Sequence, residues 1–166
     1  MEVIDRKVSD EDLKLWQAYV QAASAMWSAR KELFTESSSL VEVIRAGLDK
    51  PGERAAALEI VGFLKEDERK CLFSELLMIA GSYSGSTGFA RDFVLSLPKD
   101  WLLANIEEAA ERLLRNGTYE EYRALFEIYI RLDRDLAYKL AHRAAKHSDP
   151  DIKEAGDDFL QTLAVD

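Results

Sequence analysis

Apolar residues recur along this chain at intervals of three and four, the spacing of one face of an α-helix. The first periodic segment follows Ser9, runs to about Phe34 and is the longest helix that the pattern predicts. Shorter segments with the same period continue to the C-terminus. We find no segment with the pattern of a credible strand, so the sequence predicts an all-α fold.

Turn and capping residues separate these helical segments. Asn116 with Gly117 supplies a helix stop, and Thr118 with Glu121 forms a capping box for the next helix. The stretch 81–88 holds three glycines and four hydroxyl residues, and we interpret it as the longest loop. It is typical of a connector, although its free N–H groups could also cradle an anion at the start of the following helix.

The chain has three prolines, and each stands where a helix is expected to begin after a turn. Pro51, Pro98 and Pro150 are 47 and 52 residues apart. Proline is favoured at the first helical position, where its missing N–H is not needed. The spacing therefore predicts that the prolines mark equivalent points in successive helical units.

The residues around two of these prolines resemble a HEAT repeat. Residues 48–58 look like its loop and second-helix start, and 149–156 look like its Asp-Pro turn, aliphatic-basic pair and small-residue helix. The middle unit, 97–106, lacks the aliphatic-basic pair and has Trp101 near its place. The resemblance spans 39–165 and implies stacked antiparallel hairpins in a short α-solenoid. A closed multi-helix bundle is the alternative.

Length and composition set further expectations. At 166 residues the chain has the size of one domain, with residues 9–34 as a cap on the repeats. A net charge of −9 opposes binding to nucleic-acid phosphates and to anionic membranes. A single cysteine and the absence of a signal-peptide pattern predict a cytoplasmic protein without disulfides.

A basic stripe is the first candidate for partner binding. Lys139, Arg143 and Lys146 fall at i, i+4 and i+7 of one helix, which places them on one face. This face is either a solvated surface or a groove for an acidic segment of another protein. The preceding helix adds aromatic contact area, from Tyr119, Tyr122 and Tyr129.

The long N-terminal helix carries a possible second interface. Trp16 and Trp27 are eleven residues apart, about three helical turns, so they lie on one stripe. A neighbouring stripe holds Leu15, Tyr19 and further apolar residues, which gives the helix two faces to bury. These faces either pack in a core or serve a partner, including a second copy of this chain.

Motifs for catalysis and metal binding do not rise above chance. His142 and His147 lie five apart and miss the i, i+4 spacing of paired metal ligands. We assign no catalytic residue, metal ligand or cofactor. The sequence favours a non-catalytic protein-interaction module of the adaptor, inhibitor or immunity type. An enzyme or small-ligand-binding helical-repeat protein is the rival, because a catalytic pair can be assembled by folding alone.

Overall fold

The computed structural model describes residues 8–82, 85 and 87–165, and all regular structure in this part of the chain is α-helical. The prediction of an all-α fold is confirmed. None of the described helices is both long and apolar enough to cross a membrane. The helices are α1 (Asp10–Glu36), α2 (Leu40–Asp49), α3 (Arg54–Val61), α4 (Glu66–Cys71), α5 (Phe73–Ala80), α6 (Thr87–Leu95), α7 (Lys99–Leu114), α8 (Tyr119–Leu132), α9 (Arg134–Ala145) and α10 (Pro150–Val165).

The chain divides into two compact units, residues 1–40 and 41–166. The regular structure of the first unit is α1, apart from the first residue of α2. Ser9 caps α1, because its hydroxyl accepts a hydrogen bond from the Asp12 N–H at 3.0 Å. No residue of α1 is buried. The role of residues 9–34 as a cap on the repeats stays a prediction.

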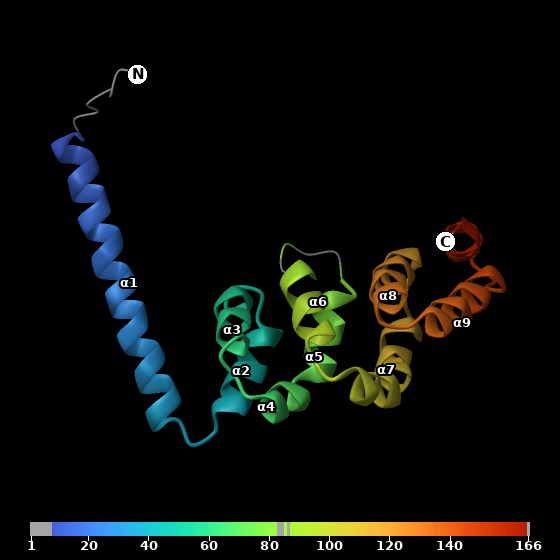
Figure 1. Ribbon diagram of the computed structural model, residues 1–166, viewed down its shortest axis with the longest axis horizontal. Coiled ribbons are helices and arrows are strands. Elements are labelled where there is room, and N and C mark those ends of the chain that lie inside the picture. The colour runs from blue at the N-terminus through green and yellow to red at the C-terminus, as the bar shows by residue number, and fades with distance from the viewer. Residues whose placement is uncertain (1–7, 83–84, 86, 166) are drawn as a thin grey trace. The chain divides into compact units, whose positions relative to one another are not determined.

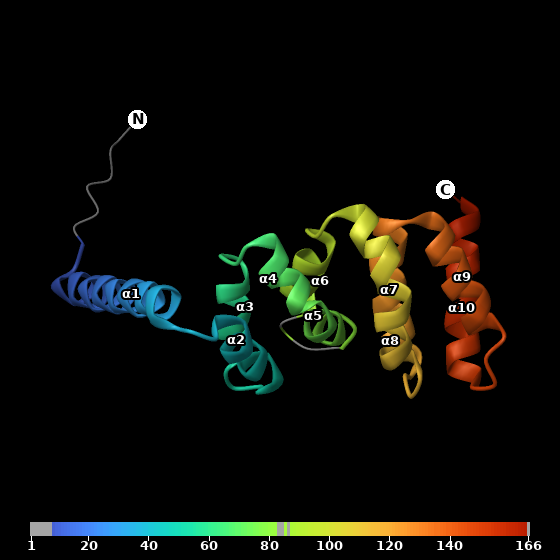
Figure 2. The same ribbon diagram turned by 90° about the horizontal axis from the view of Figure 1, so that it is seen from below.

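The second unit is a stack of antiparallel helical hairpins: α2 with α3, α4 and α5 with α6, α7 with α8, and α9 with α10 (Figures 1 and 2). The first helices of the hairpins, α2, α5, α7 and α9, form what we call row A. The second helices, α3, α6, α8 and α10, form row B, which lies along the upper edge in Figure 1. In row B contacts run from α3 through α6 and α8 to α10, and in row A α5 contacts α7. Helix α8 also contacts α9, across the two rows. The packed hairpins agree with the predicted stack of helical hairpins.

The prolines do not mark equivalent positions, which corrects the sequence interpretation. Pro51 precedes α3 and Pro150 begins α10, and both helices belong to row B. Pro98 is the N-cap of α7, which belongs to row A. This difference accounts for the departure of residues 97–106 from the repeat pattern, because they begin the first helix of a hairpin. The described residues of this unit form four hairpins, and the prolines mark only three of the helices in them.

Helices α4 and α5 meet at a bend around Leu72. Leu72 has φ −102° and ψ 7°, outside the helical region, and its N–H turns back to the Arg69 carbonyl. The side chain of Leu72 is fully buried at this bend. Arg45 of α2 donates a hydrogen bond of 2.6 Å to the Cys71 carbonyl next to it. The bend thus joins the first hairpin to the second.

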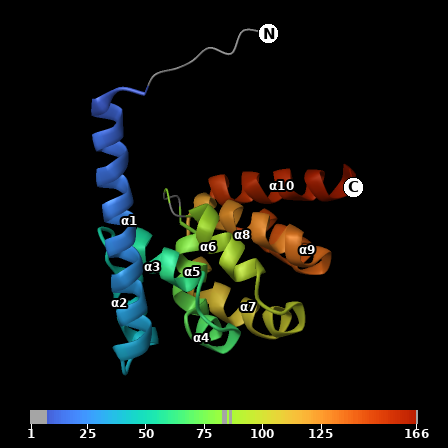
Figure 3. The same ribbon diagram turned by 60° about the vertical axis from the view of Figure 1, so that its left-hand side comes forward.

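The last hairpin has a close backbone approach at Gly156. A Cβ atom placed on Gly156 of α10 would lie 2.2 Å from the Ala145 nitrogen and 2.6 Å from the Ala144 carbonyl carbon. Only glycine fits there, which explains the small residue noted in this part of the repeat pattern. Figure 3 shows α9 and α10 side by side at the C-terminal end.

Candidate functional site

The basic stripe lies on row A, where two of its three members are paired. Lys139 Nζ is 3.2 Å from a carboxylate oxygen of Glu107, and Arg143 forms two hydrogen bonds to Glu111, of 2.5 and 3.1 Å. Lys146 is exposed, at the C-terminal end of α9, and makes no ion pair with a described residue. The stripe is therefore not a free cationic surface.

The pairing follows from matched spacing on two neighbouring helices. Glu107 and Glu111 are four residues apart on α7, as Lys139 and Arg143 are on α9, so two ion pairs form side by side. The hydrogen bonds from Arg143 lower the pKa of Glu111, and the same bonds raise the pKa of Arg143. The two ion pairs link α7 to α9, and the paired cations need no external acidic partner.

Two of the three tyrosines are core residues, which corrects their assignment to a contact surface. Tyr122 is 1% and Tyr129 4% exposed, and only Tyr119 is exposed. Tyr122 and Tyr129 are seven apart, so they share the face of α8 that packs against its neighbours. Burial raises the pKa of Tyr129, and the nearby Glu107 adds to this effect. Neither side chain offers the contact area that the sequence analysis predicted.

The tryptophans of α1 are accessible. Trp16 is 61% exposed and stacks on Tyr19 at a ring separation of 5.7 Å, while Trp27 is 63% exposed and lies under the Arg30 guanidinium. The sequence left open whether these tryptophans pack in a core. Within their own unit they do not. Their role as a second interface stays a prediction.

Ion pairs also join other neighbours within the two rows. Each pair connects two helices of different hairpins. These ion pairs therefore link neighbouring hairpins and do not stabilise individual helices. Most are partly exposed, so each contributes little to stability. The pairs are Arg45–Glu75 between α2 and α5, Arg91–Glu127 and Arg131–Asp92 between α6 and α8, and Arg123–Asp158 between α8 and α10.

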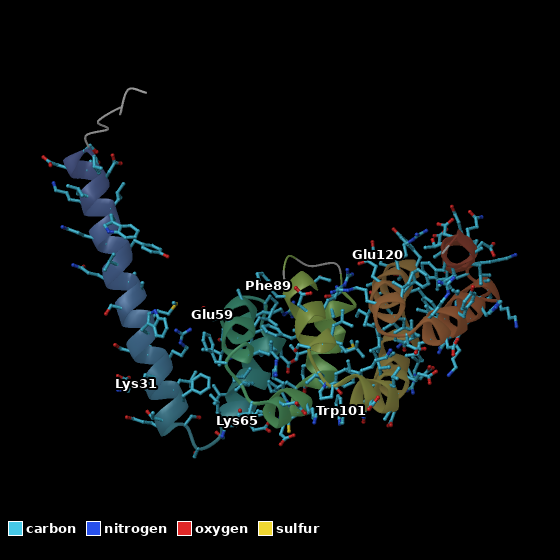
Figure 4. The ribbon with its side chains drawn as sticks, in the orientation of Figure 1. Lys31, Glu59, Lys65, Phe89, Trp101 and Glu120 are labelled. Carbon is cyan, nitrogen blue, oxygen red and sulfur yellow. The ribbon has the colours of Figure 1, made fainter. Side chains whose placement is uncertain are left out.

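An apolar hollow lies between α3 and α6 in row B. Its volume is about 340 Å³, and Leu58 and Phe93 form part of its wall. Phe89 stands at its rim and is 68% exposed. Figure 4 shows Phe89 and Glu59 near the same edge of the stack, with Trp101 near the opposite edge. We call this hollow the α3–α6 groove, lined by Ala55, Leu58, Glu59, Gly85, Phe89 and Phe93.

The local sequence of α6 explains why Phe89 is left outside. The helix buries Ala90 and Val94, which are four residues apart and define its core face. Phe89 and Phe93 are also four apart, but their stripe is rotated by one residue from that face. Phe93 is half-buried at the groove wall, and Phe89 projects beyond it. The groove was not predicted from the sequence. The paired phenylalanine spacing was the available signal.

The loop between α5 and α6 is only partly described. Tyr83, Ser84 and Ser86 lie outside the described residues, so the expectation of an anion cradle in 81–88 is not addressed there. Gly81 is buried, and a Cβ atom on it would meet the Leu113 side chain at 2.2 Å. This end of the loop therefore has a packing role.

Groups suited to metal binding do not gather within the described part of the chain, where no three of the His, Cys, Asp and Glu side chains could hold an ion together. The two histidines contact aromatic rings. His147 lies 5.9 Å from the Tyr122 ring, and His142 lies 6.5 Å from the Tyr138 ring.

Fold and site together define a stack of helical hairpins with an apolar groove in one of its two rows. No family model matches this chain, and no curated protein or solved structure is found to be similar to it. The geometry of the groove and the chemistry of its side chains are therefore the guides to function.

Proposed function

We propose that this protein is a non-catalytic protein-interaction module whose α3–α6 groove receives an apolar side chain of a partner protein. The observation that carries the proposal is the position of Phe89. Its ring is largely exposed at the rim of a hollow whose walls are apolar. Exposed aromatic residues beside such hollows are typical of binding hot spots.

The exposed ring of Phe89 can gain free energy when a partner covers it. Covering a phenylalanine side chain is worth about 1.5–3 kcal/mol, and the stack itself gains little of this from Phe89. The hollow, of about 340 Å³, can hold one large aliphatic or aromatic side chain beside the ring. A partner that fills it would bury the ring and the hollow walls together.

Charge indicates the flanking chemistry of the partner. The chain carries a net charge of −9, which favours a segment with basic residues around its apolar anchor. An acidic segment was predicted from the basic stripe, but Lys139 and Arg143 already pair with carboxylates of α7. We therefore propose a segment with basic flanking residues as the partner of the α3–α6 groove.

The proposal also includes a HEAT-like repeat fold and a cytoplasmic location. The stacked hairpins support a HEAT-like repeat, a class whose members mostly bind macromolecules along one surface. An adaptor, inhibitor or immunity-type role fits such a surface. The single cysteine, Cys71, is exposed and free, which supports a reducing compartment such as the cytoplasm.

Small-ligand binding is the second candidate function, because a second hollow is lined in part by charged side chains. This hollow, of about 500 Å³, is lined by residues of α2, α3, α5 and α7, among them Arg54, Glu75 and Arg112. One Glu75 oxygen pairs with Arg45 at 2.8 Å. The other is buried and has no hydrogen-bond partner among the described residues. A cationic ligand that raises the Tm of the wild type, but not of Glu75→Gln, would support this candidate.

The groove is tested by selecting random peptides displayed on phage against the full chain. Selected peptides should share an apolar anchor with basic neighbours, and Phe89→Ser should abolish their binding. Tyr119→Ser is the matched control, because it removes another exposed aromatic ring, on α8. Peptides that bind Phe89→Ser as well as they bind the wild type would refute the proposal.

A further inference from the structure

Helix α1 carries a heptad pattern. Starting at Leu13, one row of positions advances by three and four residues alternately to Phe34. Apart from Arg30 this row is apolar, and such spacing forms the seam along which two helices coil around each other. We call it the α1 seam, and its members are Leu13, Trp16, Val20, Ala23, Trp27, Arg30 and Phe34.

A second apolar row runs beside the α1 seam. It also advances by three and four residues, and one side of the helix is therefore apolar over about half its circumference. The opposite side is polar, with Lys14, Gln17, Gln21, Ser24, Ser28 and Lys31. The second row consists of Leu15, Tyr19, Ala22, Met26, Ala29 and Leu33.

This apolar half of α1 is exposed. No residue of the helix is buried, and most of its large apolar side chains are exposed, with both tryptophans among them. Exposed apolar area of this size on one helix marks an interaction surface. The helix is 27 residues long, nearly four heptads, which is long enough to form a stable coiled coil.

Charges beside the α1 seam indicate which partner fits it. The first turn of α1 carries Asp10 and Asp12 next to the seam, and the last third carries Lys31 next to it. The flanking positions between them are uncharged. Two copies in parallel would bring their aspartates together, which is unfavourable. Two antiparallel copies would place Asp10 of each beside Lys31 of the other.

The same antiparallel alignment matches the large side chains. The alignment that brings Asp10 opposite Lys31 puts Trp16 of one copy in the layer of Trp27 of the other. Val20 then shares a layer with Ala23, and this pairs a branched side chain with a small one. Charge and volume consequently agree on one alignment, and both agree with a second copy of this chain as the partner.

We propose that α1 is an oligomerisation arm that pairs antiparallel with α1 of a second copy through the α1 seam. The second row lies beside that contact, so two such dimers would bury it by joining into a tetramer. The proposal is independent of the α3–α6 groove, because α1 and the groove belong to different units.

Oligomeric mass is the first test. Sedimentation equilibrium of the full chain should give two or four times the monomer mass of 18.8 kDa. Trp16→Glu with Trp27→Glu should give monomers whose repeat unit keeps its helical circular dichroism. Gln21→Glu, on the polar side of α1, is the matched control and should leave the mass unchanged. A wild-type monomer at micromolar concentrations would overturn the proposal.

Charge exchange tests the direction of pairing. Lys31→Asp should weaken the antiparallel dimer roughly tenfold, because it places two aspartates together at both ends. Adding Asp10→Lys should restore the affinity, since it re-forms the pair with the signs reversed. A double variant that remains as weak as Lys31→Asp would exclude this alignment.

Other occupants of the seam give different results. A lipid surface would shift tryptophan fluorescence to the blue on addition of phosphatidylcholine vesicles to a Trp101→Phe background. If α1 instead packed against the rest of its own chain, the tryptophan fluorescence of a monomer would be blue-shifted even without vesicles. Either result in a monomeric wild type would contradict self-association. Peptide binding at the α3–α6 groove should survive in the Trp16→Glu, Trp27→Glu variant, so failure of this proposal is distinguishable from failure of the groove.

Discussion

The junctions at the two ends of the hairpin stack differ in the burial of their phenylalanine side chains. At the C-terminal end, Phe126 of α8 and Phe159 of α10 stack face to face at 4.1 Å, and both are buried. At the N-terminal end, Phe89 of α6 stands exposed beside the α3–α6 groove. The same residue type thus stabilises one junction between neighbouring helices and leaves the other open. An open apolar junction is where a partner can bind.

Truncation of the two kinds of phenylalanine should have the most unequal effects. Phe159→Ala removes a buried ring and leaves a cavity, and should lower the free energy of unfolding by about 3–5 kcal/mol. Phe89→Ala should lower it by less than about 0.5 kcal/mol, because the ring is largely in water already. Urea unfolding of both variants measures the difference. Equal losses would show that Phe89 is part of the core.

Glycine substitutions extend the comparison to the backbone. Gly156→Ala forces α9 and α10 apart and should cost about 3 kcal/mol, since the new Cβ meets backbone atoms. Gly88 is the matched control in α6, where a Cβ has no atom within 4 Å. Gly88→Ala should be neutral or stabilise by up to about 1 kcal/mol through helix propensity. Thermal unfolding distinguishes the two outcomes. A tolerated Gly156→Ala would mean that the α9–α10 crossing is not tight.

The smallest effect is expected at the charge pair between α7 and α9. Glu111 has a pKa lowered below its ordinary 4.5 by the hydrogen bonds from Arg143, so the folded state favours its ionised form. This contribution is present above pH 4.5 and is lost as the pH falls through the lowered pKa. Both side chains are nearly half exposed, so Glu111→Gln should cost only about 0.5 kcal/mol near neutral pH.

The measurement is urea unfolding of Glu111→Gln and the wild type at several pH values. Their difference in stability should be largest near neutral pH and shrink as the pH falls below 4.5. A constant difference would show that the variant acts through packing and not through the ionised carboxylate.

The sequence contains enough to predict the helices but not their neighbours. The capping box of Thr118 was recognised from local spacing, and the Thr118 hydroxyl accepts a hydrogen bond from the Glu120 N–H. Tyr122 and Tyr129 were assigned to a contact surface although they are core residues. Their spacing shows that they share one face of α8, but it does not show whether other helices cover that face. The pairing of Lys139 with Glu107 spans 32 residues, and no local pattern reveals it. Long-range packing decided each of these points.

Long-range packing also determines the α3–α6 groove. Phe89 and Phe93 have helical spacing, which alone cannot distinguish a core face from a rim. Only the packing of Ala90 and Val94 in the stack shows that the phenylalanine stripe is rotated outward. The prolines were misinterpreted for a related reason. Proline at the start of a helix is a local signal, and it does not show that Pro51 precedes the second helix of a hairpin whereas Pro98 precedes the first.

Site-specific photo-crosslinking in cells of the native host tests the central claim most directly. A benzophenone amino acid replaces Phe89 at the α3–α6 groove, or Tyr119 on α8 as the control, and ultraviolet light joins it to whatever protein lies against it. Position 89 should give one discrete crosslinked product, and position 119 should give none. Crosslinking at 119 without any at 89 would contradict the assignment of the groove as the partner-binding site.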